Sequence, residues 1–449
     1  MDVKLFNTLT GEVEKLAPLH DREIRMYHCG PTVYDYAHIG NLRTFITNDL
    51  LRRTLEYSNY MVKQVMNITD IDDKIIARSR EEGTTMGDLT RRYENLFLAD
   101  LAHLNIKTPH ALPRATDHVG GMVALIEKLL RDEYAYTTPN GVYFDIKKSK
   151  GYGALARLDL SAETQSRIET DEYEKKDPRD FALWKFWTED DGENVFAASF
   201  GRGRPGWHVE CSAMALAELG ETLDIHTGGV DLIFPHHTNE IAQSEAATGK
   251  LFSKLWLHEE FLTVDGQKMS KSLGNFTTLK MVIEHSIDPL AFRYWTLTAH
   301  YRSKANFTWE ALEGAQTALG RLKTHLGTES GIIHAEYRAR FAEIIANDLD
   351  TPRALALAWE VAKSEALSPA DKTATLLDFD RALGLQLSIN EPKYIVVPPE
   401  IQTLLTARKE ARLTKNWSRS DELRANIQAL GYDVIDTGEE QKVSKLIHK

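Results

Sequence analysis

Four side chains in this sequence have the types and spacing that could bind a metal ion. Cys29 and Cys211 are the two cysteines of the 449-residue chain, and both lie at the ends of expected sheet elements. His236 and Glu240 are four residues apart and follow Pro235, so on a helix they share one face. Two thiolates, one imidazole and one carboxylate are ligands that suit zinc. From the residues alone, cysteines that only pack in a core and a solvated His–Glu pair remain the ordinary alternatives.

Two further segments carry groups that could hold a triphosphate. His38-Ile-Gly-Asn41 closes an expected strand-to-helix loop, and its polar groups lie at a helix N-terminus, where unsatisfied N–H groups and the helix dipole favour phosphate. Lys268-Met-Ser-Lys-Ser272 places two lysines and two hydroxyls in a glycine-flanked loop. Each segment has an ordinary alternative when taken alone. The first could be a turn with a capping asparagine, and the second a solvated basic loop.

An alternation of strands and helices would position these groups. The apolar-rich residues 23–29 predict a strand, the apolar periodicity from near Asn41 predicts an amphipathic helix, and residues 60–68 predict a second strand. A strand–helix–strand unit indicates a parallel sheet with its ligand crevice at the carboxyl ends of the strands. The loop over residues 30–40 lies at such an end.

The rest of the chain predicts an inserted subdomain and then a helical region. Two helical patterns lie between about residues 88 and 131, a hairpin is expected at residues 134–137 and 142–146, and the charged stretch 158–207 is typical of a loop. The sheet resumes near Leu223. Beyond about Trp309 we expect helices only, with the proline-rich segment SINEPKYIVVPPE as a linker before a last helix pair.

Composition and charge restrict the class of protein. The chain has 42% hydrophobic and 27% charged residues, with 27 glycines and 14 prolines, which excludes collagen-like, low-complexity and disordered chains. Its 54 basic and 66 acidic residues give a net charge of −12, so a polyanion would have to meet local basic surface. The sequence has no apolar run long enough to span a bilayer, and two cysteines do not make a disulfide framework. We therefore expect a cytoplasmic protein without membrane contact.

The two loops together match the paired ATP signature of class I aminoacyl-tRNA synthetases. Five segments narrow the resemblance: CGPTVYDYAHIGNLRT (29–44), NITDIDDKII (67–76), GRPGWHVECSAMA (203–215), DIHTGGVDLIFPHHTNEIAQSEA (224–246) and VDGQKMSKSLGNF (264–276). Across this half the chain strongly resembles the cysteinyl-tRNA synthetases, and residues 407–437 are similar to the anticodon-side region of the same family. Asn41 departs from the commonest form of the first signature, which ends in a second histidine. Related class I enzymes also carry asparagine there, so we expect activity.

This resemblance implies an ATP-dependent ligase with three substrates. The enzyme would activate L-cysteine with ATP to cysteinyl-adenylate, release pyrophosphate and transfer the cysteine to the 3′-terminal adenosine of tRNA(Cys). The implied catalytic residues are His38, Asn41, Lys268 and Lys271. The implied ATP-binding residues, which act with Mg²⁺, are His38, Gly40, Asn41, Lys268, Ser270 and Lys271.

The resemblance also implies one zinc ion per chain, with the ligands Cys29, Cys211, His236 and Glu240. The motif alignment favours His236 over its neighbour His237. Such an ion would reject serine, because apolar contacts seldom separate isosteres by more than about a hundredfold and a soft metal prefers a thiolate to a hydroxyl. Glu240 is the ligand expected to loosen when the substrate sulfur enters. Three more residues of these motifs are expected to contact the substrate or orient the ligands: Trp207, His226 and Asp231.

The C-terminal tail could bind RNA. Basic side chains could neutralise phosphates and an aromatic ring could stack on an exposed anticodon base, although a charged helix face is the common alternative. The candidate residues are Arg408, Arg412, Lys415 and Trp417. Two other functions share parts of the pattern, a ligase that joins cysteine to glucosaminyl-inositol and a noncatalytic tRNA-binding paralogue. Relatives of the first lack the tail, and intact Lys268, Lys271 and metal positions argue against the second.

We therefore expect an α/β fold with a Rossmann-type parallel-sheet catalytic domain, an inserted subdomain, an all-α helical bundle and a small tRNA-binding region. The expected catalytic halves are residues 1–120 and 202–252, around an inserted connective subdomain at 121–201. The segments that follow are a stem-contact region with the Lys268 loop at 253–312, the helical bundle at 313–390, and the linker and anticodon-binding region at 391–449. The family suggests a monomer.

Overall fold

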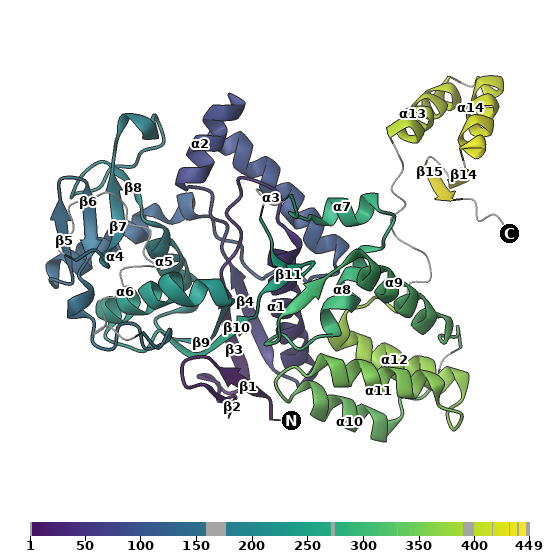
Figure 1. Cartoon of the computed structure of the whole chain (residues 1–449), viewed down its shortest axis with the longest axis horizontal. Helices are drawn as coiled ribbons and strands as arrows, with labels where there is room; N and C mark the ends of the chain where they lie inside the picture. Colours follow the sequence, from purple (N-terminus) through teal and green to yellow (C-terminus); the bar gives the residue numbers. More distant parts are fainter. Residues whose placement is uncertain are drawn as a thin grey trace. The chain divides into compact units, whose positions relative to one another are not determined.

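The computed structural model describes residues 2–158, 177–270, 274–329, 331–388, 399–414, 416–430, 432–437 and 440–445. The chain forms two compact units (Figure 1). The first unit is Met1–Leu279 with Leu290–Ser388, and the second is Lys280–Pro289 with Ile389–Lys449. Most of the expected linker SINEPKYIVVPPE lies outside the described residues. Within the described residues, no helix combines the length and apolar character that crossing a membrane requires.

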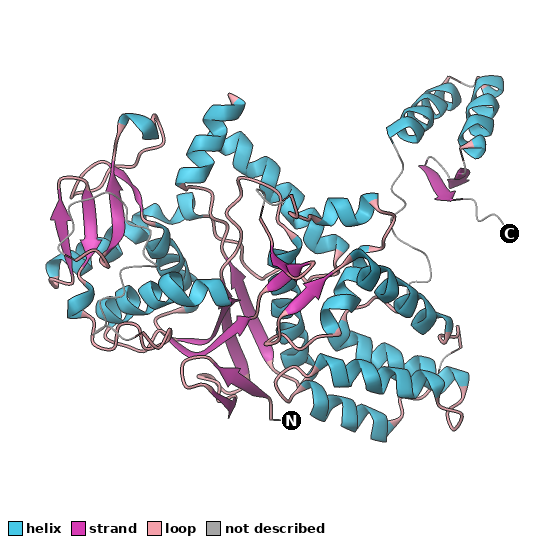
Figure 2. Cartoon of the chain, in the orientation of Figure 1, coloured by secondary structure: helices cyan, strands magenta, loops and turns pink. Residues whose placement is uncertain are grey.

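A four-stranded parallel sheet forms the centre of the first unit (Figure 2). Its strands are β3 (Glu23–His28), β4 (Met61–Met66), β9 (Leu223–Gly229) and β10 (Ser253–Glu259), in the order β10-β9-β3-β4. Helix α1 (Ile39–Tyr57) connects β3 to β4, which confirms the predicted strand–helix–strand unit. Because β3 and β9 are neighbours, the loops that follow them meet at one edge of the sheet.

Helix α1 begins at Ile39, slightly before the predicted start, because His38 caps it. The Nδ1 atom of His38 accepts a hydrogen bond from the Asn41 backbone N–H at 3.1 Å, and Asn41 Oδ1 accepts one from the His38 N–H at 3.3 Å. This reciprocal cap satisfies two N–H groups at the helix start. Gly40 packs closely on the capping residue, since a Cβ atom there would lie 3.0 Å from two atoms of the His38 ring and would force that ring to shift.

The segment between the two halves of the main sheet carries helices and a second, antiparallel sheet. Its helices are α2 (Asp73–Glu82), α3 (Met86–His103) and α4 (Val119–Arg131), and its strands are β5 (Ala135–Thr138), β6 (Gly141–Phe144), β7 (Phe181–Phe186) and β8 (Gly203–Pro205), paired in that order. The predicted hairpin is confirmed as β5 and β6. Helices α5 (Trp207–Leu219) and α6 (Thr238–Thr248) then return the chain to the main sheet.

The prediction of a loop over residues 158–207 is wrong where β7 and β8 form. Strand β7, with the sequence FALWKF, is too short to show a clear period. Strand β8 has three residues, includes Pro205 and lies at the edge of its sheet, where proline is tolerated. Residues 159–176 of the same stretch lie outside the described residues.

A small three-stranded sheet carries the second nucleotide loop. Strand β11 (Leu262–Val264) pairs antiparallel with β12 (Gln267–Lys268) and parallel with β13 (Ala305–Phe307). The chain between β12 and β13 contains α7 (Leu279–Glu284) and α8 (Pro289–Leu297). A hairpin of β1 (Lys4–Asn7) and β2 (Glu12–Lys15) packs beside β10.

The expected helical bundle is present in the first unit. Its helices are α9 (Trp309–Thr324), α10 (Ala335–Ile345), α11 (Thr351–Lys363) and α12 (Pro369–Leu383). Helices α10, α11 and α12 pack on one another, and α12 also packs against α1. The helix that follows the first nucleotide loop is therefore covered by the bundle.

The second unit contains the predicted helix pair and a hairpin that the sequence analysis missed. Helices α13 (Pro399–Leu413) and α14 (Trp417–Ala429) are followed by the antiparallel strands β14 (Tyr432–Thr437) and β15 (Glu440–Lys445). The expectation of helices only beyond Trp309 is therefore wrong. Tyr432 and Val434 pack with Ile401 and Ile427 in a small core. The apolar residues of β14 alternate over only a few positions among charged residues, so the sequence pattern of this strand is weak.

Candidate active site and metal centre

The four predicted metal ligands converge at the carboxyl end of β3. Cys29 follows β3, Cys211 is on α5, His236 lies in the turn before α6, and Glu240 lies in the first turn of α6. Their ligand atoms all lie within 4.8 Å of one another. The two sulfurs are 3.9 Å apart and not bonded, and Cys29 Sγ lies 3.7 Å from Glu240 Oε1. The packing alternative for the cysteines does not account for this convergence with a carboxylate and an imidazole.

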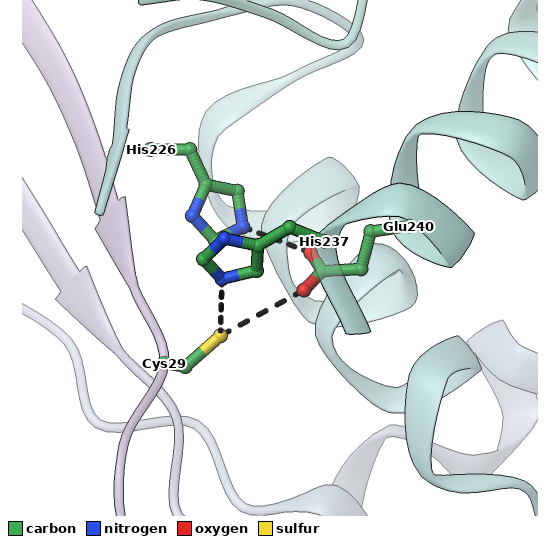
Figure 3. Close-up of side chains that lie close together, drawn as sticks. All are labelled: Cys29, His226, His237 and Glu240. Carbon is green, nitrogen blue, oxygen red and sulfur yellow. Dashed lines mark hydrogen bonds and ion pairs between the residues drawn. The ribbon is translucent and has the colours of Figure 1, made fainter. Parts of the chain in front are cut away.

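Two further histidines reach the same point. Figure 3 shows His226, from β9, and His237 directed toward the side chains of Cys29 and Glu240. His237 Nε2 lies 3.4 Å from Cys29 Sγ, and His226 Nε2 lies 2.8 Å from Glu240 Oε2. These four residues form a second group whose ligand atoms lie within 4.8 Å of one another. Cys29 and Glu240 belong to both groups.

The Nε2 atom of His236 faces the other candidate ligands and could donate its lone pair to a metal ion. It is buried and has no hydrogen-bond partner in the described part of the chain, although it lies 2.9 Å from Glu240 Oε1. Its other ring nitrogen, Nδ1, lies 2.9 Å from Nδ1 of His208, and burial holds the pKa of His208 well below its usual range. A neutral His208 can accept the Nδ1 proton of His236, which leaves the Nε2 lone pair directed at the cluster. An orphaned nitrogen beside two sulfurs fits a metal ligand.

The cluster concentrates negative charge in the protein interior. A hydrogen bond from Cys29 lowers the pKa of Cys211 to about 6, while burial raises the pKa of Cys29. Burial opposes the charge of Glu240, but His226 and His236 outweigh burial and lower its pKa to about 2. Burial also opposes a charge on His236, yet Glu240 and Cys211 raise its pKa to about 10. A metal ion bound at this cluster would take the place of the proton on His236.

An open cavity of about 290 Å³ joins the cluster to the first nucleotide loop. Cys29, Trp207, Asp231, His38 and Asn41 all line it. Trp207 is 40% exposed, and its ring centroid lies 4.2 Å from that of the His236 ring. The volume is close to the lower end of small-molecule sites. One cavity therefore borders both the metal-binding groups and the phosphate-binding groups that the sequence predicts.

His226 lies behind Glu240, away from this cavity. It is 0% exposed, and its ring stacks on Trp256 with centroids 4.5 Å apart. Its contact with Glu240 fits the orientation of a ligand, which is one of the two roles expected for it. Asp231 and Trp207, by contrast, lie on the cavity wall.

Two histidines that the sequence analysis did not single out hold the candidate ligands. His208 contacts Nδ1 of His236, and His258 Nε2 lies 2.8 Å from Nδ1 of His237. His258 in turn contacts Thr8 Oγ1 at 2.7 Å. His208 follows Trp207 within the segment GWHVEC and so carried a sequence signal. His258 lies in a buried strand, where its type and spacing give none.

The two nucleotide loops lie against each other. The Ile39 N–H donates to the Thr277 carbonyl at 2.9 Å, and His38 forms an isolated β-bridge with Thr278. The His38 ring also meets the Phe276 ring edge to face at 5.3 Å. The fold thus joins the segment after the second loop to the first turn of α1.

The second loop begins at the exposed end of β12. Lys268 is exposed there, and its carbonyl accepts a hydrogen bond from Asn275 Nδ2 at 3.1 Å. Asn275 Oδ1 accepts one from the Ser270 N–H at 2.8 Å. Asn275 therefore links the two sides of the loop. The predicted residue Lys271 lies outside the described residues.

The candidate RNA-binding residues of the second unit differ in exposure. Trp417 is 56% exposed, and the guanidinium of Arg412 lies 5.9 Å from the centroid of its ring. Arg408 is 2% exposed, which does not fit a contact with phosphate. Lys415 lies outside the described residues. The exposed Trp417 ring and the half-buried Arg412 beside it have side-chain types that can stack on a base.

Comparisons with known sequences cover nearly the whole chain. Residues 15–317 match the family described as tRNA synthetases class I (C) catalytic domain, and residues 396–443 match the cysteinyl-tRNA ligase anticodon binding domain. The chain is 44% identical over 458 residues to cysteine–tRNA ligase 1 of Burkholderia lata, a match that covers 99% of this chain and 97% of that protein. It is 40% identical over 468 residues to the cysteine–tRNA ligase of Brachyspira hyodysenteriae, with 97% and 98% covered.

Solved structures share the fold. The methionyl-tRNA synthetase of Mycobacterium tuberculosis in complex with methionyl-adenylate superposes with a TM-score of 0.57 at 15% identity, and the match covers 81% of this chain and 90% of that one. The LeuRS of Agrobacterium radiobacter K84 in a ternary complex gives a TM-score of 0.59 at 11% identity, with 83% and 85% covered. These matches confirm the predicted α/β fold class.

Proposed function

We propose that this chain, which belongs to the cysteine–tRNA ligase family of class I aminoacyl-tRNA synthetases, is an ATP-dependent ligase. It would join L-cysteine to tRNA(Cys). The observation that carries this proposal is the cavity that borders both Cys29 and His38. A cysteine whose sulfur lies at the metal-binding cluster would direct its carboxylate along this cavity toward the nucleotide loop.

In the first step a carboxylate oxygen of cysteine attacks the α-phosphate of ATP, and pyrophosphate leaves. The protein has to position two substrates and neutralise charge, so no side-chain nucleophile is needed. Burial lowers the pKa of His38, so the ring is neutral at pH 7. Since Nδ1 of His38 accepts the helix-cap hydrogen bond, the proton is on Nε2, which can donate to a phosphate or ribose oxygen.

The second loop and the start of α1 would stabilise the negative charge that develops in this step. Lys268 and Lys271 would stabilise the charge that grows on the α-phosphate and on the departing pyrophosphate, with Mg²⁺ bound to the phosphate oxygens. Gly40 and Asn41 would allow the nucleotide to approach the N-terminus of α1, and Ser270 would add a hydroxyl donor. The backbone contact between Ile39 and Thr277 supports joint action of the two loops.

We assign zinc to the metal-binding cluster, with Cys29, Cys211, His236 and Glu240 as its ligands. Sulfur and imidazole suit zinc and not Mg²⁺ or Ca²⁺, which prefer oxygen. Both Nε2 atoms lie near Glu240, but that of His236 has no hydrogen-bond partner in the described part of the chain, whereas that of His226 forms a hydrogen bond with Glu240 Oε2, which supports this set. Zinc held here would supply a soft Lewis acid on which a thiolate is strongly preferred to a hydroxyl.

The rest of the cavity would hold the remainder of the amino acid. Trp207 would cover the bound cysteine, since its exposed ring already packs on His236. Asp231, on the cavity wall, would pair with the substrate ammonium group. His226 would orient Glu240 as a ligand, as its burial and its contact with that carboxylate suggest.

In the second step the cysteinyl group moves to the 2′-hydroxyl of the terminal adenosine of tRNA, and AMP leaves. The match of residues 396–443 to an anticodon-binding domain supports tRNA as the acceptor over an amino sugar, whose ligases lack this tail. Arg412 and Trp417 would contact an exposed anticodon base. The matches over the catalytic domain argue against a noncatalytic paralogue.

We also propose the domain boundaries and the setting in which the protein works. The catalytic halves would be residues 1–120 and 202–252 around a connective insertion at 121–201, followed by 253–312, 313–390 and 391–449 as stem-contact, bundle and anticodon regions. The protein would act as a monomer in the cytoplasm. The two unbonded cysteines suit a reducing compartment.

ATP–pyrophosphate exchange with cysteine and with serine, before and after chelation, tests the function. We expect exchange with cysteine, activity with serine lower by more than about a hundredfold, and loss of exchange on chelation with recovery on addition of zinc. Aminoacylation of tRNA(Cys) then tests the acceptor. Equal activation of serine would contradict selection by the metal. Amide formation on a glucosaminyl acceptor in place of tRNA charging would contradict the acceptor.

A further inference from the structure

Arg43 is a fully buried cation two residues after the first nucleotide loop. It is 1% exposed, and its guanidinium binds four main-chain carbonyls. Nη1 donates to the carbonyls of Glu260 and Phe261 at 2.9 and 3.1 Å, and Nη2 donates to those of His300 and Ser303 at 3.4 and 2.8 Å. Its Nε atom lies 2.6 Å from a carboxylate oxygen of Glu259, so a buried carboxyl group accompanies the buried cation.

The four carbonyls belong to the segments that lead into the small sheet. Glu260 and Phe261 immediately precede β11, and His300 and Ser303 precede β13. Strand β11 pairs with both β13 and β12, and Lys268 in β12 is opposite Thr263 in β11. Arg43 thus binds the segments that lead into β11 and β13, two strands of the sheet that carries Lys268.

Asn306 continues this connection to the turn before Lys268. It lies in β13, and its Oδ1 accepts hydrogen bonds from the Gly266 N–H at 2.6 Å and from Thr263 Oγ1 at 3.0 Å. Gly266 is part of the turn that joins β11 to β12. Polar contacts therefore join α1 to Ser303, and three residues further along the same segment Asn306 binds the turn before Lys268.

We propose that Arg43 is a positioning residue for the first reaction step, because it fixes the sheet that carries Lys268 relative to the helix that begins at His38. This inference rests on the function proposed above. Lys268 lies in β12 and His38 caps α1, and their loops are more than 200 residues apart in the sequence. Packing between the two segments therefore contributes to their separation, beside the backbone contact between Ile39 and Thr277. Arginine suits this task because its planar fork offers five donors in fixed directions, whereas lysine offers a single point charge.

Arg293 provides a matched comparison within the same chain. It is also fully buried, and its guanidinium donates to the carbonyls of Leu383 at 2.8 Å and Leu104 at 3.0 Å and pairs with Asp49 at 2.5 Å. Its carbonyl partners lie in the bundle and after α3, away from the small sheet. A lysine at Arg43 and a lysine at Arg293 therefore remove similar buried interactions, but we expect only the first to move Lys268.

The test compares Arg43→Lys, Arg293→Lys and Asn306→Ala with the full-length wild-type protein. Three quantities are measured: the kcat and ATP KM of ATP–pyrophosphate exchange, the single-turnover rate of transfer from preformed cysteinyl-adenylate to tRNA(Cys), and the thermal unfolding midpoint. We expect Arg43→Lys to lower the exchange kcat by about 10- to 100-fold, because a misplacement of about 1 Å can cost about 100-fold. Transfer should change less than about threefold, since pyrophosphate has already left.

The two other variants separate positioning from stability. Arg293→Lys should lose as much thermal stability as Arg43→Lys and keep both rates within about threefold of wild type. Asn306 is exposed, so Asn306→Ala should fold normally and lower exchange by about 3- to 10-fold without slowing transfer. Unchanged exchange in Arg43→Lys, or an equal fall in both steps, would overturn the proposal.

The design also covers two ways in which the comparison could fail. If Arg43→Lys does not fold, unchanged exchange in Asn306→Ala overturns the proposal, and a selective loss of exchange in Asn306→Ala supports it. A wild-type protein that shows no cysteine-dependent exchange would refute the proposed function itself. This outcome differs from a failure of the positioning proposal, because that proposal is judged by the rates of the variants relative to a wild-type protein that is active.

Discussion

The contact between His226 and Glu240 predicts how strongly a residue behind the ligands affects metal binding. His226 Nε2 lies 2.8 Å from Glu240 Oε2, both side chains are 0% exposed, and His226 Nδ1 has no hydrogen-bond partner among the residues that the structure describes. The two ring nitrogens can therefore be tested separately. In His226→Gln the amide nitrogen can take the place of Nε2 and keep the hydrogen bond. In His226→Asn the shorter amide reaches only the place of Nδ1, so the hydrogen bond is lost.

The expected magnitude follows from the charge of Glu240. Although burial opposes its charge, its histidine neighbours lower the pKa of Glu240 to about 2, so it is ionised at neutral pH. A hydrogen bond to a charged group contributes about 1.5–3 kcal/mol, which corresponds to about 10- to 150-fold in an equilibrium constant. Residues that orient metal ligands have similar effects, about 10- to 100-fold. We expect His226→Asn to weaken zinc binding by about 10- to 100-fold and His226→Gln by less than about threefold.

Competition for zinc against a chelator of known affinity, at neutral pH, measures this difference. His28→Asn is the control, because His28 is buried in the same sheet but contacts Asn48 and Gln64 instead of the cluster. It should lose stability and keep its zinc affinity. Wild-type affinity in His226→Asn would refute the reasoning that His226 orients a ligand. Equal losses in both His226 variants would assign the effect to packing of the ring on Trp256.

Two other substitutions test the first nucleotide loop and the pH dependence of stability. Gly40→Ala should leave the melting temperature nearly unchanged, because alanine favours a helix by about 1 kcal/mol while displacement of the His38 ring weakens a helix cap of similar size. The same displacement should lower ATP–pyrophosphate exchange about tenfold. Thermal unfolding and exchange kinetics of one preparation check this, and a parallel fall in both would contradict it. Asp100→Asn should stabilise the protein more at about pH 8 than at about pH 4. Burial raises the pKa of Asp100 to about 7, so between about pH 4 and pH 7 the folded wild type keeps a proton that the unfolded chain has released. The free energy of unfolding of the wild type therefore falls by at most about 1.4 kcal/mol per pH unit as the pH rises toward 7. Urea titrations at both pH values measure the gain, and an equal gain at both would refute the assignment.

The central part of the fold could be predicted because local signals and chain connectivity agree there. The strand before Cys29, the helix after His38 and the next strand each show their own periodicity, and the crossover makes the strands parallel. The place of β9 beside β3 has no local signal, since nearly 200 residues separate the two strands. Strands β7, β14 and β15 were missed because six residues among charged neighbours give too little pattern.

The site could be predicted in its residue types but not in its arrangement. The spacing of His236 and Glu240 indicates a shared helix face, yet the turn before α6 also directs His237 to the cluster, so spacing cannot choose between the two histidines. Cys29 and Cys211 are 182 residues apart, and only the family motifs paired them. Arg43 gave no signal, because a basic residue on an amphipathic helix is expected in solvent.

The wide spacing of the ligand cluster has a consequence for biosynthesis. Glu240 lies 211 residues after Cys29, and a ribosome adds about 5–20 residues per second, so about 10 to 40 s pass between the synthesis of the two. During that interval the thiol of Cys29 is on a nascent chain that lacks its other ligands. Capture of a metal ion by these four residues would therefore be a late event, and a translation product that stops before Glu240 would lack one of the proposed ligands.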